Sequence, residues 1–189
     1  MALLAEQLVE EWLNRNGYFT IRGMKLGVHE IDLLAIRPGK NGIEARHVEV
    51  QISFRPISYI GKLTKEDQRR LGFKSANSAG HRPDKVVREG IEAWVDKKFK
   101  SPKKQRMRNL VLKDAKWSFS LVHAKVKFPD ELNYIEKKGV ELIPFETVVD
   151  ELCAAKHEFS MGSGTDLAEI VRYHPRFTVT KRLKSGRLD

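Results

Sequence analysis

Two short segments, 27–36 and 45–53, carry acidic and amide side chains in an alternating pattern. Alternate residues of a β-strand point to opposite faces, so Glu49 and Gln51 share one face of the second segment. If the two segments pair as strands, Asp32 of the first converges with them on a small polar patch beside an apolar core. Carboxylate oxygens and water are the ligands that Mg²⁺ prefers. The pattern therefore predicts a divalent-cation site with Asp32 and Glu49 as its protein ligands.

The same residues also fit a hairpin that only has one polar face. Asp32 argues against that interpretation, because it lies among apolar strand residues, where an unpaired carboxylate is costly to bury. Glu30 shares its face but is interpreted as an ordinary hairpin residue. We expect His29 and His47 to point to the opposite face and to serve the structure.

The composition limits the class of protein. The chain has 189 residues, of which 41% are hydrophobic and 32% charged, which fits one soluble globular domain with a sizeable core. Its apolar runs are far shorter than the roughly 20 residues that a membrane-spanning helix needs, and its first residues lack the pattern of a signal peptide. A single cysteine, Cys153, excludes an intrachain disulfide and a cysteine-based zinc site. We therefore expect a cytoplasmic protein with no membrane partner.

Most of the excess positive charge lies directly after the carboxylate segments. The net charge is +10, and residues 61–108 contain fifteen basic against six acidic side chains. The densest part, 97–108, has seven basic residues in twelve and no acidic one. Such a run suits a nucleic acid, because phosphate binding releases condensed counterions, although a solvated loop has the same composition. The residues predicted to bind nucleic acid are Lys97, Lys98, Lys100, Lys103, Lys104, Arg106 and Arg108.

Hydrophobic periodicity and turn residues divide the chain into elements. Helices are predicted over residues 2–16, 62–76, 83–99, 131–138 and 146–155, and strands over 18–25, 28–37, 43–54, 117–128 and 140–144. A loop is predicted around Pro102, and a short helix with a basic tail over 158–189. A three-strand meander followed by crossovers predicts an α/β fold, with a mixed central β-sheet flanked by helices on both faces.

The helix sequence AEQLVEEWLNRNGYF, followed by GVHEIDLLAI and then by HVEVQI, resembles the PD-(D/E)XK nuclease superfamily. The likeness is to the branch that contains archaeal Holliday-junction resolvases and restriction-endonuclease-like repair enzymes. The segment LVHAKVKFPDELNYIEKKGVELIPFETVVDEL resembles the closing part of the same core. The resemblance implies a restriction-endonuclease-like domain over residues 1–157, with a basic helical insertion around 80–115.

The resemblance also implies roles for individual residues. Glu6 corresponds to the family's helix-borne acid, Asp32 to its metal-bridging aspartate and Glu49 to the acid of its E-x-K element. Gln51 stands where the family usually has lysine. Glutamine can hold a water molecule by hydrogen bonding, but it carries no charge. We therefore assign Gln51 a catalytic position without the usual ammonium group.

A positive charge could instead come from Lys62 or Lys65 on the following helix. The resemblance implies an endonuclease that uses Mg²⁺ or Mn²⁺ to hydrolyse DNA phosphodiester bonds, since a bound cation activates water and stabilises charge on phosphoryl oxygen. Related nucleases often cut two strands as dimers, so a homodimer is one expected state. The alternative is a catalytically weak or inactive nuclease-fold module that binds DNA or RNA.

Overall fold

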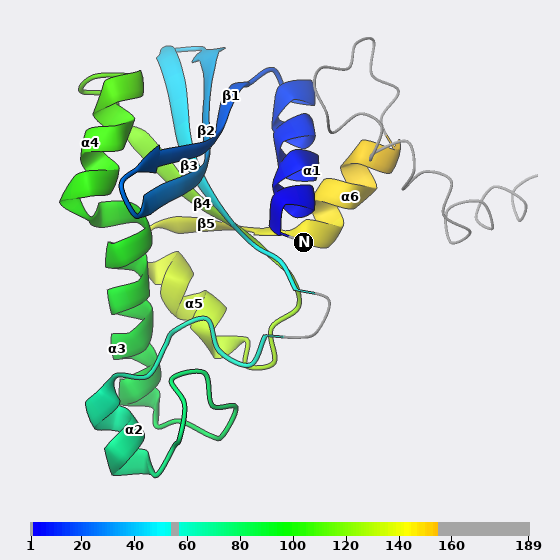
Figure 1. Cartoon of the computed structure of the whole chain (residues 1–189). Helices are drawn as coiled ribbons and strands as arrows, with labels where there is room; N and C mark the ends of the chain where they lie inside the picture. The colour runs from blue at the N-terminus through cyan, green and yellow to red at the C-terminus, as the bar shows by residue number, and fades with distance from the viewer. Residues whose placement is uncertain (1, 54–56, 155–189) are drawn as a thin grey trace, which may run out of the picture.

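The fold is built on a five-stranded β-sheet with helices on both sides (Figure 1). The computed structural model describes residues 2–53 and 57–154. The strands follow one another in chain order across the sheet; they are β1 (Phe19–Leu26), β2 (His29–Gly39), β3 (Gly42–Gln51), β4 (Trp117–His123) and β5 (Val140–Pro144). The first three are antiparallel, whereas the β3–β4 and β4–β5 pairs are parallel. The predicted α/β class and the mixed sheet are therefore confirmed.

Two tight turns fold the first three strands into a meander. Gly27 has a φ of +60° between β1 and β2, and Gly42 has a φ of +117° where the β2–β3 hairpin closes opposite Gly39. Glycine adopts such angles without a steric penalty, because it has no Cβ. The meander brings the two carboxylate-bearing strands next to each other.

A long crossover connects the parallel strands β3 and β4. It contains α2 (Lys65–Leu71), α3 (Asp84–Val95), the π-helical segment η1 (Asp96–Lys100) and α4 (Pro102–Val111). The other helices are α1 (Ala2–Arg15) before the sheet, α5 (Asp130–Lys137) between β4 and β5, and α6 (Phe145–Ala154) after it. Parallel neighbours require crossovers of this kind, and the helices in them cover the faces of the sheet.

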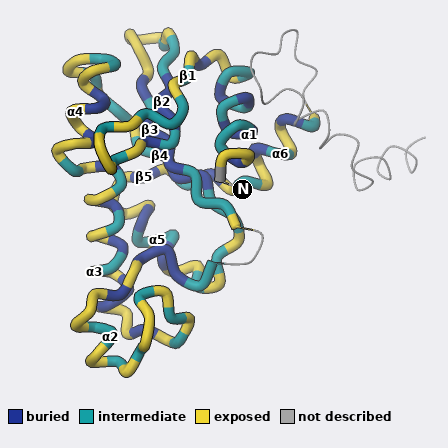
Figure 2. The backbone as a smooth tube through the Cα atoms, in the orientation of Figure 1, coloured by how far each residue is buried: buried dark blue, intermediate teal, exposed yellow. Residues whose placement is uncertain are grey.

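The core consists of two large apolar layers on opposite faces of the sheet, together with a smaller cluster of Ile31, Leu34 and Met107. The first lies under α1 and α6, and the second under α3, η1 and α5 (Figures 1 and 2). Buried members of the first layer include Leu8, Val9, Leu13, Val48, Val148 and Leu152, and those of the second include Ile91, Val95, Phe99, Leu121 and Ile135. Because side chains alternate along β3, Val48 faces the first layer and Glu49 faces the crossover helices.

The loop predicted around Pro102 is wrong, because this segment is the start of α4. Ser101 is the N-cap, and its side chain accepts a hydrogen bond from the N–H of Lys104. Pro102 then occupies the first helical turn, where its missing N–H costs nothing. The densest basic stretch is therefore helical on both sides of Ser101.

The helix predicted over 62–76 is shorter than expected. Thr64 caps its start by accepting the N–H of Asp67, and Gly72, with a φ of +71°, ends it. The short helix and basic tail predicted over 158–189 lie outside the described residues. Within the described ranges, no helix is long and apolar enough to cross a membrane.

Candidate functional site

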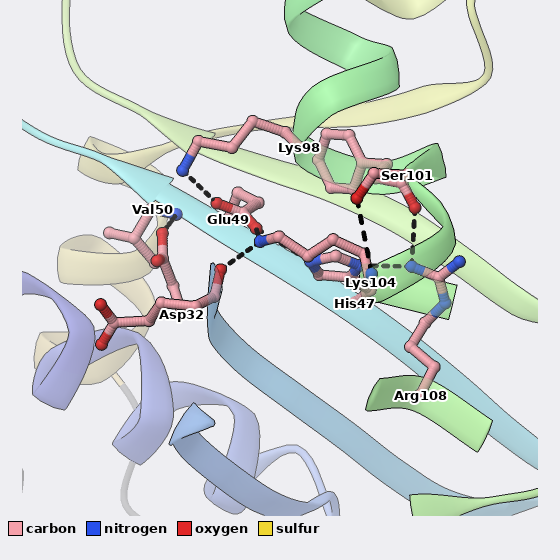
Figure 3. Close-up of polar contacts among 10 residues, drawn as sticks. Asp32, His47, Glu49, Val50, Lys98, Ser101, Lys104 and Arg108 are labelled. Atoms are coloured by element: carbon pink, nitrogen blue, oxygen red, sulfur yellow. Dashed lines mark hydrogen bonds and ion pairs between the residues drawn. The ribbon is translucent and has the colours of Figure 1, made fainter. Parts of the chain in front are cut away.

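Asp32 and Glu49 lie where the pairing of β2 with β3 ends. The ladder of paired residues runs from the hairpin to Leu33 and Val48, so the next residues of the two strands are Asp32 and Glu49. The N–H of Val50 donates a 2.8 Å hydrogen bond to Asp32 Oδ2 (Figure 3). This bond ties the two strands together where their ladder stops. The structure thus brings Asp32 and Glu49 together.

The Asp32 carboxyl is poor in compensating positive charge. The bond from Val50 is the only hydrogen bond that it makes to the described residues. Burial and, secondly, the negative charge of Glu49 raise the pKa of Asp32 to about 7, against the opposing charge of Lys98. A carboxyl in this state gains from a bound cation, because the cation stabilises its ionised form.

Glu49, by contrast, is surrounded by donors although its side chain is only 1% exposed. Lys98 Nζ lies 2.5 Å from Glu49 Oε2, and Lys104 Nζ lies 2.7 Å from Oε1 (Figure 3). The Nε2 atom of His47 is 2.9 Å from the same Oε1. Burial alone would raise the pKa of Glu49, but the His47 hydrogen bond and the Lys98 and Lys104 charges outweigh it and lower the pKa to about 2. Glu49 is therefore a stable anion.

A second hydrogen bond on His47 fixes its ring. Burial lowers the pKa of His47 to about 4, so the imidazole is neutral at pH 7. A neutral ring can donate from Nε2 to Glu49 and accept at Nδ1 from Arg108 Nη1, which lies 3.0 Å away. Arg108 is held in turn by the carbonyl of Phe99 at 2.7 Å. The contacts from the Phe99 carbonyl through Arg108 and His47 therefore fix the orientation of the Glu49 carboxylate.

The expectation that His47 points to the opposite face is therefore wrong. Residues two apart on a strand share a face, so His47, Glu49 and Gln51 all face the crossover helices. The alternation rule was sufficient to place His47 beside Glu49. Its ring lies against Phe99 and Phe119, with centroid distances of 4.9 and 6.0 Å.

The predicted nucleic-acid-binding residues divide into an inner and an outer set. The inner set is Lys98, Lys104 and Arg108, which turn toward the sheet, and the last two are buried. We correct the prediction for Lys104 and Arg108, because each is engaged by buried acceptors and neither is free to contact phosphate. The outer set is Lys97, Lys100, Lys103 and Arg106, all of which are exposed.

The sequence could have shown that Lys104 and Arg108 share one helix face with Met107, although not which part of the sheet that face approaches. Ser101 followed by Pro102 marks a helix start, and a helix from that point places Lys104, Met107 and Arg108 on one face. Met107 is fully buried against the sheet, so its helical neighbours must approach the sheet as well.

The remaining predicted site residues lie at different distances from this group. Glu6 of α1 lies near the acidic group. Burial and the charge of Glu30 raise the pKa of Glu6, and the charge of Glu49 makes a smaller contribution. Gln51 ends β3 on the same face as Glu49 and pairs in register with His123. Lys65 opens α2, which lies at the far end of α3 from the strands that carry Asp32 and Glu49 (Figure 1). The structure thus does not bring Lys65 to the site.

A divalent cation fits this site if water or phosphate completes its ligands. The described part of the chain contains no group of three or more His, Cys, Asp or Glu side chains that could hold a metal ion. Mg²⁺, however, usually keeps several waters and is held by one or two carboxylates together with substrate phosphates. Asp32 and Glu49 would be that smaller set. Both Glu49 oxygens already accept from Lys98, Lys104 and His47, so a cation shared by the two carboxylates would have to displace one of these donors.

Comparisons with known proteins found no relative of this chain. No family model, no curated protein and no solved structure matches this chain.

Proposed function

We propose that the chain is a nuclease that depends on Mg²⁺, or on Mn²⁺ in its place, and hydrolyses phosphodiester bonds of DNA. The observation that carries the proposal is the convergence of a half-buried, charge-poor Asp32 with Glu49 at the end of the β2–β3 ladder. A bound divalent cation would supply an activated water and a Lewis acid for phosphoryl oxygen. The chain's own part is to hold the two carboxylates in place, through Val50 N–H for Asp32 and through Lys104 and His47 for Glu49.

A hollow between the β1–β2 turn and α4 presents two basic side chains, which suits a polyanionic substrate. It measures about 480 Å³ and is lined by Leu26 and Gly27 at the β1–β2 turn and by Pro102, Lys103 and Arg106 of α4. The five residues of chain that separate this turn from Asp32 span about 17 Å. A phosphate backbone that contacts Lys103 and Arg106 would have to extend over about this distance to reach the carboxylates.

Asp32→Asn is expected to abolish cation-dependent nicking of supercoiled plasmid, with a loss on the order of 100-fold or more. The amide keeps the size of the side chain and an acceptor for Val50 N–H, but removes the negative charge that would hold the cation. Nicking is measured by gel with Mg²⁺, with Mn²⁺ and with EDTA. Glu66→Gln, an exposed carboxylate on α2, is the matched control. Cation-dependent nicking by the Asp32 variant at the parent's rate would refute the site.

Replacing Lys97, Lys103 and Arg106 by glutamine should weaken DNA binding and make it less sensitive to salt. Each lost phosphate contact should reduce the slope of log K against log[salt] by about 0.9. Fluorescence anisotropy at several salt concentrations measures that slope. The control variant replaces three exposed lysines on other parts of the chain: Lys40, Lys74 and Lys137. Equal slopes for the two triple variants would remove the outer basic set from the proposed interface.

The second candidate is a nuclease-fold module that binds DNA or RNA without cutting it. The observation in its favour is that lysines hold both oxygens of Glu49, while Gln51 brings no charge. It predicts salt-sensitive binding with no cleavage under any cation. The nicking assay separates it from the first candidate, and competition between duplex DNA, branched DNA and RNA identifies the ligand.

A further inference from the structure

The two lysines that hold Glu49 differ in how firmly they are fixed. The Lys104 side chain is only 4% exposed, and its ammonium group donates both to Glu49 Oε1 and to the carbonyl of Glu30. The Lys98 side chain is 35% exposed, and Glu49 Oε2 is its one hydrogen-bond acceptor among the described residues. Since an ammonium group has three donors, Lys98 leaves most of its capacity to solvent.

The backbone explains why Lys98 reaches Glu49 from the solvent side. Lys98 lies in η1, where the wider π-helical turn directs the neighbouring Phe99 into the core between Trp94 and Phe119. Phe99 is completely buried, so it anchors the backbone of this turn. Such single π-helical turns are frequent at functional sites. The long Lys98 side chain can therefore swing outward while the backbone stays in place.

The balance of charges around the site favours replacement of Lys98 at Glu49 Oε2 by a divalent cation. The negative charges of Glu30 and Glu49 act on Glu6, and those of Glu49 and Glu6 act on Asp32. Lys25 pairs with Glu30 and Arg22 offsets the charge of Glu6, whereas Lys98 and Lys104 both bind Glu49. Asp32 is thereby left without an ion pair among the described residues. A divalent cation shared by Asp32 and Glu49 would relieve that deficit. It would also repel an ammonium group that shares the same carboxylate, and with twice the strength of a monovalent ion.

We propose that Lys98 is an exchangeable internal cation, which holds Glu49 Oε2 in the metal-free protein and releases it when a divalent cation binds to Asp32 and Glu49. Lys98 then stands at the solvent side of the site, free to contact a phosphate group of the substrate. Lys104 stays in place, because its ammonium group would otherwise be buried without its acceptors. This inference rests on the proposed cation site, but not on cleavage.

The test is the affinity of the metal-free protein for Mn²⁺, measured by calorimetry without nucleic acid. Lys98→Met removes the competing ammonium group and keeps the apolar stem, so the variant should bind Mn²⁺ about tenfold more tightly than the parent protein. Lys97→Met is the matched control, because Lys97 is exposed and makes no contact with Glu49. It removes the same charge from the neighbouring position and should change the affinity less than about twofold.

Several outcomes would overturn the exchange. Unchanged or weaker Mn²⁺ binding by a folded Lys98→Met protein would show that Lys98 supports Glu49 instead of competing for it. An equal gain in Mn²⁺ affinity in the Lys97→Met protein would show that the loss of one positive charge, and not the contact with Glu49, causes the effect. A crystal structure with Mn²⁺ gives a second readout: Lys98 Nζ should lie beyond hydrogen-bonding distance of Glu49 Oε2, and a retained contact would refute the proposal.

The same experiment separates this inference from the proposed nuclease function. Tighter Mn²⁺ binding by Lys98→Met in a protein that never nicks plasmid would support the exchange and refute the nuclease. Cation-dependent nicking by the parent protein together with unchanged Mn²⁺ affinity in Lys98→Met would support the nuclease and refute the exchange. Asp32→Asn should abolish Mn²⁺ binding in either background, and binding that survives it would place the ion elsewhere and refute the exchange.

Discussion

Glu49→Gln should lower the free energy of unfolding by about 3 kcal/mol, although it changes only one atom of a buried side chain. The loss arises because the positively charged partners of the carboxylate stay in place without it. The Lys104 side chain is 4% exposed, and its ammonium group would be left without a counter-charge. Lys98 and His47 would each lose an anionic acceptor. Breaking a buried ion pair by removing one partner costs more than the pair contributes, because a charge stays buried.

Urea-induced unfolding at pH 7 with EDTA measures this loss for Glu49→Gln. The double variant Glu49→Gln, Lys104→Met should recover at least half of it, because methionine fills the space of the lysine stem without a buried charge. Lys98→Met alone should cost about 1 kcal/mol or less, since this side chain is partly in solvent. A Glu49→Gln protein within about 1 kcal/mol of the parent would show that the lysines do not depend on Glu49.

The acidic half of the site could be predicted from local sequence patterns, and the basic half could not. Alternation along two strands and one hairpin turn were enough to bring Asp32 and Glu49 together, because their register depends on a short loop. Lys98 and Lys104 reach Glu49 from 49 and 55 residues further along the chain. Their approach depends on how the crossover packs on the sheet, and no local period encodes that.

The charge run 97–108 was also ambiguous for a physical reason. Composition counts charges but not directions, and a helix divides its side chains between two faces. The apolar residues Phe99 and Met107 set the inward face and carry Lys98, Lys104 and Arg108 toward the sheet. The same basic run thus supplies both internal counter-ions for Glu49 and an outer basic surface.

The two carboxylates should have opposite effects on stability, which follows from their partners. Glu49 is ionised and compensated, so its removal destabilises the protein. Burial and the Glu49 charge oppose the ionisation of Asp32, and together they raise its pKa to about 7. Asp32→Asn should therefore make the metal-free protein more stable at pH 8, by about 2 kcal/mol, although the full shift from the ordinary pKa would allow about 4 kcal/mol.

The sign and the pH window follow from proton linkage. Because the folded pKa of Asp32 lies above its unfolded value of about 4, the folded protein binds the proton more tightly, and stability falls as the pH rises from about 4 to about 7. His47 acts in the opposite direction, since burial lowers its pKa to about 4 and stability rises with pH up to about 6.5. The two slopes partly cancel in the parent protein, so the difference between variant and parent isolates Asp32.

Chemical unfolding with EDTA from pH 4.5 to 8 should show that difference growing from nearly zero to about 2 kcal/mol in favour of Asp32→Asn. Glu30→Gln is the control, because Glu30 lies two residues away on the same face of β2 but is exposed and paired with Lys25. Its effect should stay within about 0.5 kcal/mol at every pH. Saturating Mg²⁺ should stabilise the parent and leave Asp32→Asn unchanged, because only the ionised carboxyl gains from the cation. A variant less stable than the parent at pH 8 with EDTA would mean that the Asp32 charge is compensated, and would remove the electrostatic reason for a cation at this site.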